Sequence, residues 1–273
     1  MGNRVLVGAV PRLSMADFDR YRGPNVAVDV AVLTCVADDL AVLIQNRTKN
    51  PRGKVLPGRF LREGETVSDG LRAALSEKEG VEIGPIDAAL DHVVAEPNST
   101  TSTKAHLVGV FDRLGRDRRS SWSMSLAHYL VLPLDRLDGV KGDFVPIRPD
   151  GSVDSELLFD HDAIVRKAAR HLRARYELTP DPENLLTNRE ITLPELQKIH
   201  EAVLDDPLRV DTFRRRMEAL LDEAVDPDHP GRKKTRPSGP NGGPPTRLWI
   251  KRSLISSGPG GANRLLRLPR AAD

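Results

Sequence analysis

The chain has one cysteine, few aromatic residues and no long apolar run. The single cysteine, Cys35, excludes a framework of internal disulfides, and its place in an apolar run favours a buried, inert thiol over a nucleophile. No window approaches about 18 consecutive apolar residues, so no membrane-spanning helix is expected. The N-terminus carries neither a secretory signal nor a myristoylation motif. We therefore expect a cytoplasmic protein.

Acidic residues are missing from a long stretch close to the C-terminus. From His229 to Arg270 there are ten Lys or Arg and no Asp or Glu, although the net charge of the whole chain is only +2. This asymmetry indicates contact with nucleic acid or another polyanion. The 273 residues are enough for two domains of roughly 100–200 residues each.

The first part of the chain has the pattern of a mixed α/β domain. Runs rich in β-branched residues predict strands at 26–35, 40–45, 104–114 and 125–134. Helical spacing predicts helices at about 67–79 and at 161–176. The expected organisation is an N-terminal extension (1–23), an α/β domain (24–158), a connecting helix (159–180), a second domain (181–253) and a disordered tail (254–273).

The second domain has the pattern of a winged helix-turn-helix. Thr192 and Glu195 form a capping box that opens a helix, whose apolar side consists of Leu196, Ile199 and Val203. Asp205-Asp206-Pro207 ends this helix, and the next one places on one face Val210, Phe213, Met217 and Leu220. A loop rich in Pro, Gly, Lys and Arg (226–245) and a short strand (246–252) complete the winged arrangement.

The second of these helices is the expected DNA-reading element. With Phe213 at the centre of the apolar face, Arg215 projects almost opposite it, while Thr212 and Arg214 lie on the flanks. Arg209 stands at the N-terminal end, which usually enters the major groove first. Arg216 falls nearer the buried edge, where an ion pair or a phosphate contact is expected.

The basic loop is the expected wing. The cations of this loop should contact DNA phosphates, which gives an affinity for DNA that depends on salt and has little sequence preference. These cations are Arg232, Lys233, Lys234 and Arg236. The alternative is that the run at 214–216 is a solvated charge run, but the adjoining turn and the basic wing favour DNA binding.

Residues 56–81 resemble the Nudix box, whose pattern is G-x5-E-x7-R-E-U-x-E-E-x-G-U with U aliphatic. The approach Leu56-Pro57-Gly58, the pair Gly64-Glu65, the aliphatic Leu75 and the closing Gly80-Val81 match. Three positions depart from the pattern: Arg59 replaces the box glycine, Ala73-Ala74 replace Arg-Glu, and Lys78 replaces the second glutamate of the Glu77 pair. The alternative is a chance Gly-Glu before an amphipathic helix, which the strand before it and the glycine helix stop disfavour.

These departures argue against a catalytic metal site. The box normally aims several carboxylates at divalent metal, which stabilises pyrophosphate charge and activates water. Ala74 removes one ligand, and Lys78 places an ammonium group where Mg²⁺ would lie. We therefore expect no catalytic residue, no metal and no cofactor.

A degenerate Nudix domain joined to a winged helix resembles the NrtR family, Nudix-related transcriptional regulators of NAD metabolism. The resemblance extends over about 24–252 and is carried by the box, by the connecting helix "LFDHDAIVRKAARHLRARY", by the helix-turn-helix "ITLPELQKIHEAVLDDPLRVDTFRRRMEALL" and by the closing strand "GPPTRLWIKR". It implies a Nudix α/β/α sandwich followed by the winged helix. It also implies a homodimer that represses NAD biosynthesis or salvage genes by binding double-stranded operator DNA, with ADP-ribose or a related nucleotide as effector.

The resemblance also implies which residues line a nucleotide pocket. They are Arg47, Phe60, Glu65, Arg116 and Arg118, with Arg119 in the same loop as the last two. Guanidinium groups suit pyrophosphate because they can donate two hydrogen bonds at once. The alternative for each arginine is simple exposure to solvent. The histidines His106, His128 and His161 lack metal-ligand spacing and are expected to be structural.

Two other functions stay open. One is a Nudix hydrolase of ADP-ribose-type pyrophosphates that uses Glu65 and Glu77. The other is an RNA-binding adaptor with an inactive Nudix fold, which is weaker because the second domain lacks aromatic stacking signatures.

Overall fold

The structure, a computed structural model, describes residues 23–79, 86–87, 103–120, 122–229, 231–238 and 243–251. The expected N-terminal extension, apart from Gly23, and the expected disordered tail lie outside these ranges. Within them, no helix is both long enough and apolar enough to cross a membrane.

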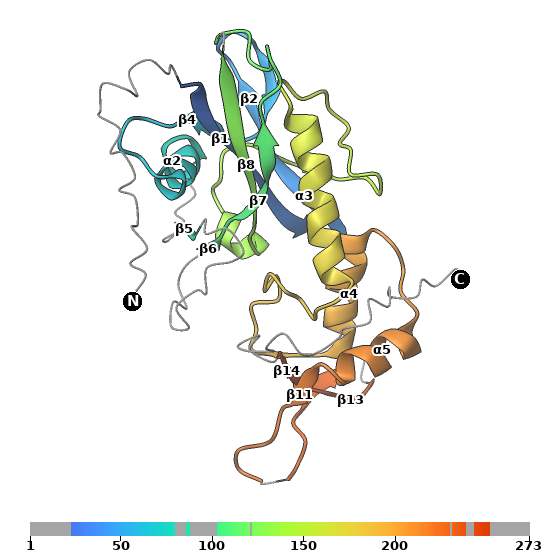
Figure 1. Ribbon diagram of the computed structural model, residues 1–273. Coiled ribbons are helices and arrows are strands. Elements are labelled where there is room, and N and C mark those ends of the chain that lie inside the picture. The colour runs from blue at the N-terminus through green and yellow to red at the C-terminus, as the bar shows by residue number, and fades with distance from the viewer. Residues whose placement is uncertain are drawn as a thin grey trace, which may run out of the picture.

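A seven-stranded sheet forms the first part of the molecule (Figure 1). Its strands follow the order β3-β2-β1-β8-β7, while β4 pairs with β1 and β9 with β2. Their bounds are β1 Asn25–Val36, β2 Asp39–Arg47, β3 Gly53–Val55, β4 Gly58–Phe60, β7 His106–Phe111, β8 Ser123–Val131 and β9 Asp143–Pro146. A separate pair consists of β5 Ile86–Asp87 and β6 Thr103–Lys104, and the 3-10 helix η1 spans Leu134–Leu137. The strands expected at 26–35 and 40–45 are confirmed, whereas those expected at 104–114 and 125–134 end earlier, at Phe111 and Val131.

Alternate residues of β1 build two apolar cores, one on each face of the sheet. Successive side chains of a strand point to opposite faces. Val28, Val30 and Val32 pack with Leu71 and Leu75 of helix α2 (Val67–Glu79). The opposite face packs against helix α3 (His161–Tyr176), whose expected bounds are confirmed. The result is the α/β/α sandwich visible in Figure 1, with α2 and α3 on opposite sides of the sheet.

The C-terminal part is a winged helix. It contains α4 (Leu193–Leu204) and α5 (Val210–Glu218), a sheet in the order β10-β14-β11, and the hairpin β12-β13. Its strands are β10 Glu190–Ile191, β11 Leu221–Glu223, β12 Thr235–Ser238, β13 Gly243–Arg247 and β14 Trp249–Lys251. The capping box of Thr192 and Glu195 is confirmed. Figure 1 shows the wing projecting at the end of the molecule farthest from the seven-stranded sheet.

The apolar face expected for α5 is only half correct. Phe213 and Met217 are buried, but Val210 is 63% exposed and Leu220 lies beyond the end of the helix at 36% exposure. Val210 occupies the first turn, and none of the described elements covers it enough to bury it. The helical spacing was therefore right, while the width of the buried stripe was overestimated.

Candidate ligand cavity and DNA-binding surface

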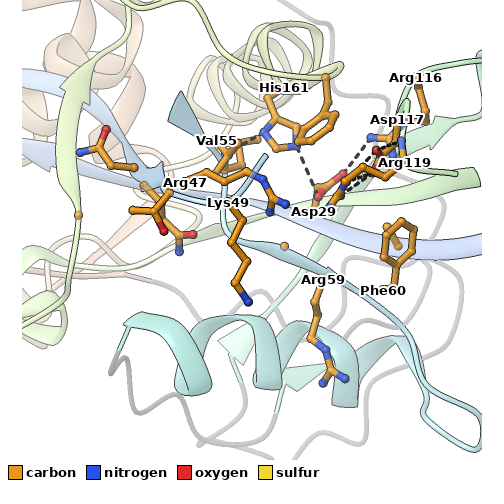
Figure 2. Close-up of a pocket in the computed structure, with 18 of the residues that line it drawn as sticks. Asp29, Arg47, Lys49, Val55, Arg59, Phe60, Arg116, Asp117, Arg119 and His161 are labelled. Carbon is orange, nitrogen blue, oxygen red and sulfur yellow. Dashed lines mark hydrogen bonds and ion pairs between the residues drawn. The ribbon is translucent and has the colours of Figure 1, made fainter. Parts of the chain in front are cut away.

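A cavity of about 660 Å³ opens where the sheet meets the N-terminal end of α3 (Figure 2). Its walls come from β1, from β2 and the loop after it, from β4, from the loop before β8 and from α3. The lining is rich in cations: Arg47, Lys49, Arg59, Arg116, Arg119 and Lys141. Two aromatic rings, Phe60 and Phe159, complete it. A cavity with these walls suits a ligand that has both anionic and flat apolar parts.

A buried charge network forms one wall of the cavity. Arg116 donates to Asp29 at 3.0 Å and to Asp160 at 2.9 Å, and its side chain is only 3% exposed. His161 lies 3.5 Å from Asp29. Burial alone would raise the pKa of the Asp29 carboxyl, but its interactions with His161, Ser125 and Arg116 hold that pKa well below its usual range. Asp29 is therefore ionised at neutral pH.

His161 links the cavity to the backbone of the box approach. Its Nδ1 accepts a hydrogen bond from the Leu56 N–H at 2.8 Å. Because Nδ1 is the acceptor, Nε2 carries the proton that faces Asp29. His161 is the first residue of α3, so the same side chain that closes the cavity also fixes the start of that helix.

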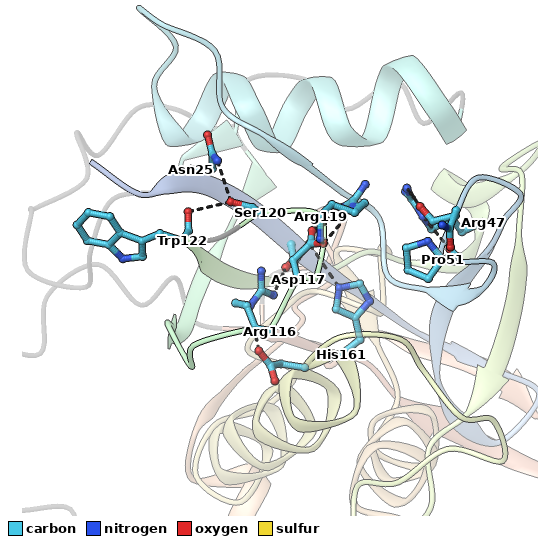
Figure 3. Close-up of polar contacts among 12 residues, drawn as sticks. Asn25, Arg47, Pro51, Arg116, Asp117, Arg119, Ser120, Trp122 and His161 are labelled. Atoms are coloured by element: carbon cyan, nitrogen blue, oxygen red, sulfur yellow. Dashed lines mark hydrogen bonds and ion pairs between the residues drawn. The ribbon is translucent and has the colours of Figure 1, made fainter. Parts of the chain in front are cut away.

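An arginine close to two aromatic rings lies beside this charge network, and Figure 3 shows it next to Asp117. The guanidinium carbon of Arg119 lies 5.9 Å from the centre of the Phe60 ring and 5.4 Å from that of Phe159. Asp117 pairs with Arg119 at 2.9 Å. Phe159 has a φ of 63°, a left-handed conformation that costs energy for a bulky residue and is often found at functional sites.

The structure brings some of the expected pocket residues together and separates others. Arg47, Phe60 and Arg116 line the cavity. Arg118 is exposed and lies outside the lining, and Glu65 pairs with Arg59 at 3.2 Å instead of facing the cavity.

The lining residues that sequence reasoning missed include Asp29, Phe159 and His161, the last of which was expected to be only structural. For Asp29 a signal existed, since it is the one charged residue inside the apolar run of β1. A buried charge of that kind needs a partner and marks a site. Nothing in the sequence distinguishes Phe159.

The described side chains of the box helix do not offer a set of metal ligands. Ala74 is fully buried and, like Ala73, has no ligand atom. Glu65 is engaged by Arg59 and by the backbone N–H of Arg62 at 2.7 Å. Among the described residues no three His, Cys, Asp or Glu come close enough to share a metal ion. The side chains of 77–79 lie outside the described residues.

Helix α5 presents arginines to solvent at the end of the molecule opposite the cavity. Arg215 is exposed, and Arg214 is exposed while pairing with Glu218 at 2.9 Å. Thr212 is half-buried, and Arg209 is the exposed N-cap residue. Arg216 lies at the buried edge, as expected, but it donates to the Glu177 carbonyl at 3.0 Å and so fixes α5 to the end of α3.

Three of the four wing cations pair with carboxylates of the protein. Lys233 pairs with Glu223 at 2.5 Å, Lys234 with Glu190 at 2.8 Å and Arg236 with Glu195 at 2.7 Å. Arg232 is exposed. Exposed ion pairs of this kind contribute only about 0–1 kcal/mol, so phosphate oxygens can replace the carboxylates at small cost. The expectation of phosphate contacts therefore remains open for all four side chains.

Helix α3 connects the cavity to the winged helix. At its C-terminal end Tyr176 donates to Asp181 at 2.7 Å, and its ring meets that of His200 in α4 at 5.0 Å. His200 in turn contacts the Phe213 ring of α5 at 5.2 Å. Burial lowers the pKa of His200 to about 4, so the ring is neutral at neutral pH and accepts from the Asp181 N–H at 3.3 Å. Both ends of α3 are thus anchored by buried polar groups.

These features define a class of protein: an α/β/α sandwich whose last helix leads into a winged helix-turn-helix. No family model matches the chain. The chain is 24% identical over 206 residues to the "ADPR responsive transcriptional repressor NtrR" of Acinetobacter baylyi. The matched residues make up 72% of this chain and 73% of that protein.

Solved structures share the fold. NrtR of Shewanella oneidensis in complex with a 27mer DNA has a TM-score of 0.57 at 23% identity, with 83% of this chain and 93% of that chain covered. A MutT/nudix family protein of Enterococcus faecalis has a TM-score of 0.60 at 19% identity, with 88% and 95% covered. Sequence and fold together confirm the resemblance to the NrtR family that the box, the connecting helix and the winged helix predicted.

Proposed function

We propose that the protein is a DNA-binding transcriptional repressor of NAD biosynthesis or salvage genes, controlled by ADP-ribose or a related nucleotide. The observation that carries this proposal is that helix α3 has a cation-rich cavity at its N-terminal end and contacts an arginine-bearing helix-turn-helix at its C-terminal end. The names of the relatives support it: one is an ADPR responsive transcriptional repressor, and another was solved with DNA. A homodimer would place two copies of α5 on a palindromic operator.

The route from cavity to DNA follows α3. A nucleotide that bridges the lining cations would contact groups at the start of α3, where Asp160 and His161 already hold the Arg116 and Asp29 side chains. A displacement of α3 would reach α5 through Tyr176, His200 and Phe213. Such control requires that the nucleotide bind the two dimer states with different affinity.

The Nudix domain is proposed to be catalytically inactive. Incubation with ADP-ribose and Mg²⁺ should give no AMP above the level of a buffer blank, because Ala73 and Ala74 supply no metal ligand. Chromatography of the nucleotide products, with an active Nudix pyrophosphatase as positive control, measures this. Turnover at ordinary enzyme rates, about 1–1000 per second, would instead establish the hydrolase alternative.

A further inference from the structure

Arg173, in the last turn of α3, joins two parts of the molecule through three backbone carbonyls. Its Nε donates to the Val203 carbonyl of α4 at 3.0 Å. Its terminal nitrogens donate to the carbonyls of Pro149 at 2.6 Å and Arg148 at 3.1 Å, in the turn that follows β9. The donors of a guanidinium have a fixed planar geometry, so this one side chain sets the position of α4 relative to that turn.

The bond to α4 lies where the helix-turn-helix changes direction. The last four carbonyls of an α-helix have no partner within the helix, and Val203 is the second-last residue of α4. Asp205, which caps the helix in a left-handed conformation with a φ of 54°, begins the turn toward α5. A cation at this end of a helix also interacts favourably with the helix dipole. Arg173 therefore fixes the end of α4 from which the DNA-reading helix follows.

The turn after β9 begins a segment, 147–160, that ends in the wall of the cavity. Near the end of this segment the N–H of Leu158 donates to the Lys54 carbonyl at 2.9 Å. Phe159, the next residue, lines the cavity, and so does His161, the first residue of α3. The segment and α3 thus both lead from the cavity to the arginine.

The turn and α4 contact α3 in different ways. A side-chain carbon at Gly151 would lie 3.0 Å from the Cα of Arg166, so the turn packs directly onto the backbone of α3 and should move with it. Helix α4 shares an apolar core with α3 that includes Leu172 and Val203. Apolar contacts have no preferred direction, so they keep α4 attached without fixing its orientation. The hydrogen bonds of Arg173 supply that orientation.

We propose that Arg173 is a positioning residue through which a change at the cavity reaches the helix-turn-helix. The inference rests on the proposed control of DNA binding by a nucleotide, and it names the side chain that carries this control. A ligand that displaces the start of α3 or the end of the segment 147–160 moves the guanidinium and the carbonyls it holds. The bond to Val203 passes this displacement to α4, and with it to α5.

The test is a linkage cycle on the full chain. Fluorescence anisotropy gives the operator Kd with and without saturating ADP-ribose, and calorimetry gives the Kd for ADP-ribose. In Arg173→Met each ligand alone should bind within about threefold of the wild-type Kd, because the cavity lining and the arginines of α5 are intact. The effect of ADP-ribose on the operator Kd should fall from at least about fivefold in the wild type to less than about twofold in this variant.

Two further variants make the result specific. Arg170→Met removes an exposed arginine one turn earlier in α3 and should keep the whole effect of ADP-ribose. Arg173→Lys keeps the charge at the end of α4 but lacks the planar fork that holds three carbonyls, so it should also lose the effect. Circular dichroism melting identifies any variant that does not fold. A folded Arg173 variant with the wild-type effect, or an equal loss of the effect in Arg170→Met, would overturn the inference.

Hydrogen exchange separates this inference from the choice of effector. Operator binding should change the exchange rates of the amides of 157–161 by at least about threefold in the wild type, because coupling between two sites is reciprocal. The same amides should show no change in Arg173→Met. If ADP-ribose leaves the operator affinity of the wild type unchanged, the proposed effector fails, while this exchange result still supports Arg173 as the link. Exchange rates that do not respond to the operator in the wild type contradict the link.

Discussion

The double substitution Arg214→Ala/Arg215→Ala is expected to weaken binding to a palindromic operator fragment by about 100-fold or more. Both side chains project into solvent from α5, where they can reach base edges or phosphates. Each arginine contact of this kind contributes about 1–3 kcal/mol, and every 1.4 kcal/mol is a factor of ten. The exposed pair of Arg214 with Glu218 adds little to stability, so the melting temperature should hardly change. Gel shifts over a range of salt concentrations measure both affinity and salt dependence.

The control for this variant removes the same charge elsewhere. Arg118→Ala/Arg136→Ala takes two exposed arginines from the Nudix part and should leave operator affinity within about twofold. An equal loss of operator affinity in both variants would mean that binding depends only on the overall electrostatic field of the protein. Equal binding of the wild type to operator and to random DNA would remove the repressor proposal itself.

Methionine at Arg116 is expected to lower the free energy of unfolding by about 3–5 kcal/mol. The guanidinium joins Asp29 to Asp160 inside the molecule, and its removal leaves two poorly solvated carboxylates without that partner. The loss of such a partner is far more costly than the loss of an exposed pair. Urea unfolding followed by circular dichroism measures the change.

Arg113→Met provides an internal comparison because Arg113 also donates to Asp160, at 2.9 Å, from a side chain that is 73% exposed. We expect this variant to lose about 1 kcal/mol or less. Similar losses in the two variants would show that the Arg116 network is not buried in solution as the structure places it.

Local patterns gave much of the fold before the structure was known. Alternation along β1 predicted a strand, and the capping box at Thr192 fixed the start of α4, because both depend on neighbours in sequence. The box outline placed α2 correctly for the same reason. The error at Val210 has a tertiary cause, since helical spacing does not tell which end of a helix stays uncovered.

The candidate site was less accessible to sequence reasoning. Arg116 and Asp160 are 44 residues apart, and only the folded sheet and α3 bring them together on Asp29. The wing lysines were expected to be available to phosphates, whereas Lys233 and Lys234 meet carboxylates that arrive from other elements. Ion pairs between distant elements leave no local pattern in the sequence. The charge composition therefore predicted a basic wing but not which carboxylates pair with its lysines.

We expect a nucleotide in the cavity to control DNA binding by the winged helix. Fluorescence anisotropy of a labelled operator fragment, with and without saturating ADP-ribose, measures this control. ADP-ribose should raise the apparent Kd for the operator by at least about fivefold, and saturating operator should weaken ADP-ribose binding by the same factor. An operator affinity that stays unchanged while calorimetry shows the cavity to be saturated would mean that the nucleotide does not control DNA binding.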